Sequence, residues 1–171
     1  MLKMLTTQLT GKFQQIQEKE ALAIEDAARA LAQAIIGDGS IYVKGFEEML
    51  AIESEMIDGI ETLPKCRRYE PGAALTSIDR VIVASRFADH EEAITIMKEA
   101  QEQGAQVIGL SAVKTNDDPL FKQADFPIDT KVTEPLLPFD MERICFPSAM
   151  AGLYSYYAIY ITVKEILSEY E

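Results

Sequence analysis

The sequence predicts an α/β fold built on a parallel sheet, and a strand–helix–strand unit at residues 79–112 carries this prediction. The apolar, β-branched run of residues 81–83 is typical of a strand buried on both faces of a parallel sheet. Apolar side chains then recur at helical spacing over residues 93–100, and Gly104 ends that helix before a second apolar run. Parallel neighbours need a crossover helix, so this unit indicates the fold class.

The composition is that of an acidic globular protein. The 171 residues are 48% hydrophobic and 26% charged, which suits one domain with its own core. The formal net charge of −12 argues against nucleic acid and against an anionic membrane surface as partners. We therefore expect a single cytoplasmic domain over residues 1–171.

The sequence gives no sign of a metal or cofactor. Cys66 and Cys145 lack the CxxC spacing of metal and redox sites, and His90 is the only histidine. We expect two reduced thiols, no metal and no cofactor. The N-terminal segment lacks the apolar core of a signal peptide, and the most apolar stretch, residues 149–163, is too short to cross a bilayer.

The first third of the chain reads as helix, strand and helix. Residues 1–36 keep helical spacing of apolar side chains, with a break expected near Gly11. A strand is expected at residues 40–44. Gly45, directly after it, indicates either a plain turn or a close approach of the backbone to a ligand. A helix with an acidic, solvated face is expected over residues 46–60.

The residues on either side of the central unit predict a charged edge strand before it and an N-terminal cap for its helix. Residues 65–70 are charged, as suits a short edge strand. Within them, Arg67 and Arg68 form the only basic cluster, and we expect pairing with surface acids rather than anion binding. Asp89, with Glu92 three residues on, is expected to cap the central helix.

The last third is expected to hold a short helix, a strand and a long helix. Asp117 or Asp118 is expected to cap the short helix, and residues 126–129 to form the last parallel strand. Residues 131–145 are expected to be mostly irregular. The final helix, residues 149–170, opens after a cap at Ser148, and it has so little polar face that the sheet, a second subunit or both must cover it.

The loop of residues 85–90 is the predicted site. It leaves the carboxyl end of the central strand and enters a helix N-terminus, where backbone N–H groups and the helix dipole favour anions. No Ser-His-Asp pattern surrounds Ser85, so a hydrolase is not expected.

Several blocks, in their order and spacing, resemble the SIS (sugar isomerase) family of phosphosugar-binding domains. They are IEDAARALAQAIIGDGSIYVKG at residues 24–45, DRVIVAS at 79–85, EEAITIMKEAQEQGAQVIGLSA at 91–112, DPLFKQAD at 118–125 and FPSAMAGLY at 146–154. The resemblance covers most of the chain. It implies a three-layer αβα sandwich with a five-stranded parallel sheet in flavodoxin-like order, long N-terminal and C-terminal helices, and a homodimer.

The resemblance also implies a site. In this family the loop after the third strand binds the phosphate of a sugar phosphate through hydroxyls and backbone amides. Isomerases such as phosphoheptose isomerase add a carboxylate and a histidine that move protons between sugar carbons. Ligand contacts are expected from Gly45, Phe46, Ser85, Arg86, Phe87, Ala88, Asp89, His90 and Ser111, although a plain turn serine is the simpler reading of Ser111. The candidate catalytic residues are His90 and Glu134.

The predicted loop departs from the family pattern. That pattern is roughly Ser-x-Ser-Gly-x-Thr, and of its hydroxyl residues this chain keeps Ser85 alone. Phe87 and Ala88 replace the second serine and the glycine, and His90 replaces the threonine. Arg86 and His90 are the groups that can stand in for the lost hydroxyls, Arg86 through a bidentate grip. The final helix has no histidine, which argues against a phosphoheptose-type mechanism.

Three hypotheses follow, in order of preference. The first is a domain that binds a sugar phosphate or a related anionic carbohydrate derivative without obvious catalysis. The second is a phosphosugar isomerase that uses His90 and a glutamate as proton carriers. The third is a non-catalytic dimeric interaction module whose ligand site has been lost.

Overall fold

The central strand β3 (Arg80–Phe87) divides the hydrophobic core into two layers. The structure, a computed structural model, describes all of residues 1–171. Alternate side chains of β3 point to opposite faces of the sheet. Ile82 and Ala84 belong to one buried cluster, whereas Val81 and Val83 belong to the other. This double burial explains the continuous apolar run that the sequence shows at this strand.

The sheet is parallel throughout, with strand order β2-β1-β3-β4-β5. Its other strands are β1 (Ile41–Gly45), β2 (Cys66–Arg68), β4 (Gln106–Ala112) and β5 (Phe126–Asp129). This is the flavodoxin-like order, and the expected three-layer αβα sandwich with five parallel strands is confirmed. The charged edge strand is confirmed as well.

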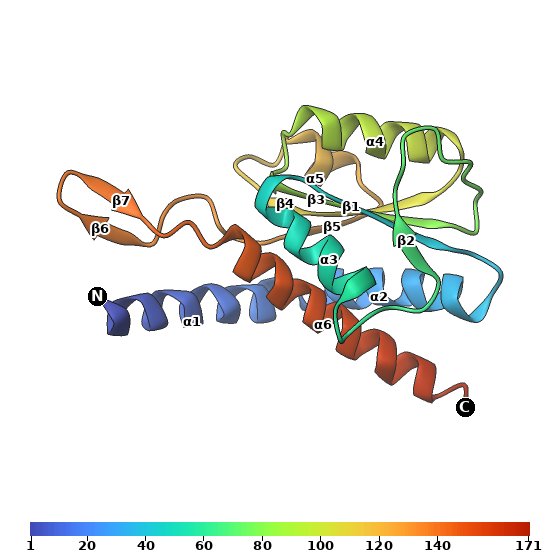
Figure 1. The fold of residues 1–171 in the computed structure, drawn as a ribbon, viewed down its shortest axis with the longest axis horizontal. Helices are drawn as coiled ribbons and strands as arrows, with labels where there is room; N and C mark the ends of the chain where they lie inside the picture. The colour runs from blue at the N-terminus through green and yellow to red at the C-terminus, as the bar shows by residue number, and fades with distance from the viewer.

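Helices cover both faces of the sheet (Figure 1). One layer contains α2 (Ala21–Ile36), α3 (Leu50–Asp58) and α6 (Ser148–Ser168). The opposite layer contains α4 (Glu91–Glu102) and α5 (Pro119–Gln123). A single 3-10 turn, η1 (Glu47–Met49), joins β1 to α3. No helix has the length and apolarity needed to cross a membrane.

Two segments project beyond the sandwich on the same side (Figure 1). One is α1 (Leu2–Lys19), and the other is an antiparallel hairpin of β6 (Leu137–Phe139) and β7 (Glu142–Ile144). Residues 131–145 are mostly irregular, as expected, but the sequence analysis did not foresee this hairpin. Its turn uses Asp140 at a φ of 51°, a conformation that the short Asp side chain tolerates.

The break in the N-terminal helix lies at Glu20 rather than near Gly11. Gly11 continues α1 without interruption. Glu20 leaves the helical conformation with ψ of 8°, and its Oε1 accepts a hydrogen bond of 2.6 Å from the backbone N of Asp129. Its other oxygen lies 3.6 Å from Nζ of Lys131. Contacts with a distant strand end therefore coincide with the break.

Two expected helix caps are also different. His90, not Asp89, caps α4, since its Nδ1 accepts from the backbone N of Ala93. Asp89 instead pairs with Lys114 at 2.5 Å. Asp118 does precede α5, but its carboxylate accepts from the amide N of Lys114 rather than from the helix. In each case the carboxylate interacts with a group outside the helix instead of with the first amides of the helix.

Gly45 marks a close approach between β1 and its own continuation. A Cβ at this position would lie 2.3 Å from the carbonyl oxygen of Met49 and 2.7 Å from its carbonyl carbon. The backbone amide of Gly45 donates to Glu53 at 2.8 Å. The glycine that the sequence singled out thus lets η1 pack directly on the strand end.

We expect Gly45→Ala to lower the free energy of unfolding by about 2 kcal/mol or more, because the methyl group must displace backbone atoms. Gly11→Ala is the matched control. Nothing lies within 4 Å of a Cβ at Gly11. This substitution should stabilise α1 by about 0.5–1 kcal/mol. Urea unfolding of both variants measures the difference, and equal effects would contradict the packing described at Gly45.

Candidate functional site

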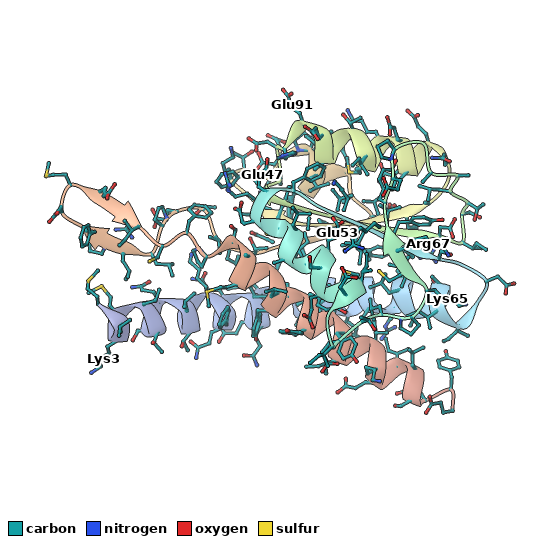
Figure 2. The ribbon with its side chains drawn as sticks, viewed as in Figure 1. Lys3, Glu47, Glu53, Lys65, Arg67 and Glu91 are labelled. Carbon is teal, nitrogen blue, oxygen red and sulfur yellow. The ribbon has the colours of Figure 1, made fainter.

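The candidate site lies at the carboxyl edge of the sheet, between β1 and β3. The order of the strands reverses there, since β2 lies on one side of β1 and β3 on the other. In open parallel sheets the crevice at such a reversal is where ligands bind. Three segments meet at this edge: η1, the loop of residues 85–90, and the N-terminus of α6. Glu47 and Glu91, at the starts of η1 and α4, lie at this end of the sheet (Figure 2).

A three-residue polar cluster joins these segments. Nε and Nη2 of Arg86 donate to the two carboxylate oxygens of Glu48 at 2.5 and 2.6 Å. The hydroxyl of Ser148 donates to Oε1 of Glu48 at 2.6 Å. Two parallel N–H donors of one guanidinium form the bidentate arrangement that arginine makes with carboxylates and phosphates. We call this group the Glu48–Arg86–Ser148 cluster.

The cluster is charged under ordinary conditions. The hydrogen bond from Arg86 is the main cause that lowers the pKa of Glu48 to about 2, and the Ser148 hydroxyl lowers it further against the opposing effect of burial. The same hydrogen bond raises the pKa of Arg86. A carboxylate therefore occupies the guanidinium throughout the physiological pH range.

The acidic face expected for residues 46–60 is not uniformly solvated. Glu53 is only 5% exposed; besides accepting from Gly45 N, it pairs with Arg68 Nε at 3.1 Å. Glu48 is held in the cluster. The sequence analysis placed these acids in solvent because the helical spacing of residues describes one helix alone. Their main partners belong to neighbouring strands, which the spacing does not describe. Arg68 pairs with Glu53 and Asp58, as expected for this basic residue.

His90, the last residue of the predicted loop, faces η1. Its Nε2 is 3.5 Å from a carboxylate oxygen of Glu47, and its ring packs on Phe46 with centroids 4.5 Å apart. Because Nδ1 accepts the capping hydrogen bond from Ala93, the neutral ring carries its proton on Nε2. The ring can therefore donate from Nε2, but it can accept a proton there only by giving up the cap.

The other candidate catalytic residue lies apart from this group. Glu134 is exposed, and no hydrogen bond or ion pair joins it to His90 or to the loop. The acid that faces the histidine is Glu47, the first residue of η1. No group of three or more His, Cys, Asp or Glu side chains is arranged to hold a metal ion.

The Ser85 hydroxyl and two backbone amides of the predicted loop form hydrogen bonds within the chain. The hydroxyl of Ser85 is buried and donates to the carbonyl of Phe87 at 2.7 Å. The amide of Ala88 donates to the carbonyl of Ala112 at 2.9 Å, and that of His90 to Phe87 at 3.3 Å. β3 thus continues through the start of the loop, with a register shift between Ala84 and Phe87. These hydroxyl and amide groups are satisfied by the chain itself.

Aromatic and basic side chains surround the loop. Phe87 contacts Phe146 edge-on, with ring centroids 5.8 Å apart, and Lys114 Nζ lies 4.7 Å from the Phe87 centroid. Ser111, the remaining predicted contact, is buried near the end of β4. Lys44 lies over Phe46 and forms no ion pair, whereas Arg86 and Lys114 each pair with a carboxylate.

Sequence reasoning missed two members of the cluster. Glu48 was read as a solvated acid, and Ser148 as a helix cap, although Pro147 occupies the cap position. They lie 38 and 100 positions along the chain from their respective partners, Arg86 and Glu48. The available signal was indirect: an arginine in the site loop of a chain with net charge −12 is expected to find a carboxylate.

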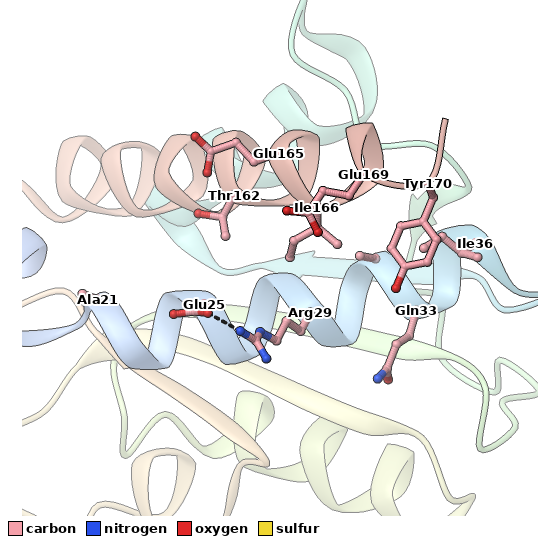
Figure 3. Close-up of a pocket in the computed structure, with 11 residues that line it drawn as sticks. Ala21, Glu25, Arg29, Gln33, Ile36, Thr162, Glu165, Ile166, Glu169 and Tyr170 are labelled. Carbon is pink, nitrogen blue, oxygen red and sulfur yellow. Dashed lines mark hydrogen bonds and ion pairs between the residues drawn. The ribbon is translucent and has the colours of Figure 1, made fainter.

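A separate groove of about 700 Å³ lies between α2 and α6 (Figure 3). Its charged residues are Glu25, Arg29, Glu165 and Glu169. Arg29 is paired with Glu25, so the groove is acidic and does not suit a phosphate. We therefore place the candidate anion site at the sheet edge.

Comparison with known proteins gives a family and a fold. The model of a domain of unknown function, DUF2529, matches residues 1–167. An uncharacterized protein of Bacillus subtilis (strain 168), YwjG, is 41% identical over 172 residues, which cover 99% of both chains.

Solved structures with this fold share little sequence with the chain. A protein of Listeria monocytogenes, proposed to be a sugar-phosphate isomerase, superposes with a TM-score of 0.73 at 18% identity, covering 98% of this chain and 90% of its own. Phosphoheptose isomerase GmhA from Neisseria gonorrhoeae gives 0.69 at 15% identity, covering 98% and 97%. The resemblance to SIS domains is thereby confirmed at the level of the fold.

We expect Glu48→Gln to lower the free energy of unfolding at pH 7 by about 1–2 kcal/mol. The lowered pKa corresponds to about 3 kcal/mol at most. We discount that figure for solvent screening, because Arg86 is 44% exposed. The folded-state pKa is below the unfolded one, so this stabilisation is complete above about pH 4.5 and is lost as the pH falls toward 2.

Urea unfolding at pH 7, 5, 4 and 3 measures this effect, and the gap between the wild type and Glu48→Gln should narrow only below about pH 4.5. Glu25→Gln is the control, since Glu25 forms an exposed pair with Arg29 one helical turn away. Its effect should stay within about 0.5 kcal/mol. A pH-independent gap for Glu48→Gln would contradict the charge assigned to the cluster.

Proposed function

This chain belongs to the DUF2529 family, and we propose that it binds a sugar phosphate or a related anionic carbohydrate derivative at the carboxyl edge of its sheet. The observation that carries the proposal is the bidentate grip of Arg86 on a carboxylate beside the first residue of α6. The donors that hold this carboxylate have the geometry that a phosphate group requires. The fold supports the proposal, since proteins with the same fold include sugar-phosphate isomerases by name.

The surrounding groups suit a carbohydrate. In this proposal the phosphate lies on Arg86 and Ser148, and the sugar extends toward Phe46 and His90. The His90 Nε2–H and the Glu47 carboxylate offer a donor and an acceptor to sugar hydroxyls. Phe46 adds an apolar surface to this side of the site. Small-molecule sites commonly combine a few polar groups with such apolar walls.

The geometry favours binding over isomerisation. A proton carrier must release and accept a proton at the atom that faces the substrate. In His90 the inward nitrogen caps α4, which fixes the proton on the outward nitrogen. Taking up a proton at Nε2 would therefore disrupt the first turn of that helix. Glu134, the other candidate, makes no contact with this group.

The first test is a thermal-shift screen with sugar phosphates, amino-sugar phosphates and inorganic phosphate. A ligand at a hundred times its Kd stabilises the native state by about 2.7 kcal/mol. For a chain of this length the Tm should rise by about 5 °C or more. Arg86→Ala should abolish the rise, because it removes both guanidinium donors.

Arg29→Ala is the matched control for this screen, since Arg29 is also an exposed, carboxylate-paired arginine but lies in the α2–α6 groove. It should leave the ligand-induced rise unchanged. A rise that survives Arg86→Ala, or that disappears with Arg29→Ala, would place the ligand elsewhere. No rise with any probe would overturn the proposal and favour the interaction-module hypothesis.

We also propose that the chain forms a homodimer through an exposed stripe on α6. Met150, Tyr157 and Ile161 are 50, 41 and 57% exposed. Their spacings of seven and four residues place them on one helical face, as in helices that pair. A second copy presents an identical stripe, so two-fold pairing would bury both.

Two free thiols, at Cys66 and Cys145, fit a cytoplasmic location.

Light scattering coupled to gel filtration tests the dimer. The wild type should elute with about twice the 19.1 kDa of one chain. Ile161→Glu should shift it to the monomer, because it places a charge in the buried stripe. Ile78→Glu is the control, since Ile78 is 49% exposed but precedes β3 in a loop. A monomeric wild type, or a dimer that survives Ile161→Glu, would refute this interface.

A further inference from the structure

We propose that Glu48 is a resident competitor for the ligand: it occupies the Arg86–Ser148 donors in the free protein, leaves them when a phosphate monoester binds, and thereby restricts the site to dianionic phosphates. This inference rests on the proposed function and specifies the ligand class of that same site. It follows from the occupancy of the donors, the charge of the occupant and the position of Glu48 on a short, strained turn.

The donors are already in use. Both oxygens of Glu48 are bound, one by Arg86 alone and the other by Arg86 and Ser148, over distances of 2.5–2.6 Å. A ligand oxygen at normal hydrogen-bond distance from the same donors would overlap the Glu48 carboxylate. Binding of an anion at Arg86 is therefore an exchange of one anion for another.

The exchange selects by charge. The competing carboxylate is tethered to the chain, so it acts at a high effective concentration. A free monocarboxylate offers Arg86 the same group without the tether, and it is outcompeted. A phosphate monoester at neutral pH brings nearly two charges and three acceptor oxygens. It therefore gains more from Arg86 and Ser148 than Glu48 does.

The tether is a segment that can release the carboxylate. Glu48 lies in η1, which is only three residues long. The preceding residue, Glu47, has a φ of 50°, a left-handed conformation that is uncommon for a residue with a long side chain. Strain of this kind is found at ligand clamps and switches. Met49, the last residue of the turn, is buried and packs against Gly45, so release of the carboxylate falls to rotation of the Glu48 side chain.

The neighbouring acids do not take the place of Glu48. Glu47 faces His90, and Asp89 pairs with Lys114. Removal of the Glu48 charge should therefore leave Arg86 open to an external anion. This makes Glu48→Gln the informative variant and Glu91→Gln its matched control, because Glu91 is an exposed acid at the same end of the sheet and forms no ion pair with Arg86.

The experiment measures the Kd of inorganic phosphate and of glucose 6-phosphate by calorimetry for the wild type and both variants, with acetate as the monocarboxylate probe. Glu48→Gln should bind both phosphates at least about tenfold more tightly than the wild type, since it removes a charged competitor. It should also gain acetate binding that the wild type lacks. Glu91→Gln should leave the phosphate affinities within about threefold.

Glu48→Ala is a second variant, included because the side-chain amide introduced by Glu48→Gln can still accept a hydrogen bond from Arg86. Both Glu48 variants should bind phosphate more tightly, and circular dichroism should show that each is folded. If the wild type binds phosphate through Arg86 but neither Glu48 variant binds it more tightly, the competitor role is wrong and the proposed function stands. If neither the wild type nor the Glu48 variants bind either phosphate, both are overturned.

Discussion

Burial of β3 on both faces is the constraint from which the arrangement of the molecule follows. Its apolar side chains contribute to both core layers, so polar side chains can be accommodated only at the ends of the strand. At the carboxyl end the first residues free to carry polarity are Ser85 and Arg86. Ser85 is still buried and bonds its own loop, which makes Arg86 the first side chain able to meet a ligand.

The acidity of the chain then determines the form that the site takes. With 28 acidic and 16 basic side chains, a cation at the sheet edge readily meets a carboxylate. Arg86 is paired with Glu48 and Lys114 with Asp89, while Lys131 contacts Glu20 and Asp129. In the proposed function, an anion therefore binds at this surface in exchange for a carboxylate of the chain, not by filling an open basic pocket. This is a physical reason why the net charge does not exclude an anionic ligand.

The features that the sequence predicted are those with local causes. The β-branched run of β3 and the left-handed Gly104, at a φ of 92°, act within their own segments, and both are confirmed. The errors share a different origin. The helix breaks at Glu20, whose carboxylate accepts a hydrogen bond from a backbone amide 109 positions away. Glu48 was assigned to solvent, although its carboxylate binds Arg86 and Ser148. Periodicity cannot anticipate partners that only the folded sheet brings together.

The loop gives a physical reason why the proposed anion site rests on a side chain rather than on backbone amides. With Phe87, Ala88 and His90 in place of the hydroxyl and glycine positions of SIS domains, the amides of Ala88 and His90 bond to carbonyls of the chain, and the His90 ring caps α4. A guanidinium can be covered and uncovered by one carboxylate. In the proposed function, Arg86 therefore serves as the anion site, and the chain can occupy that site with its own Glu48.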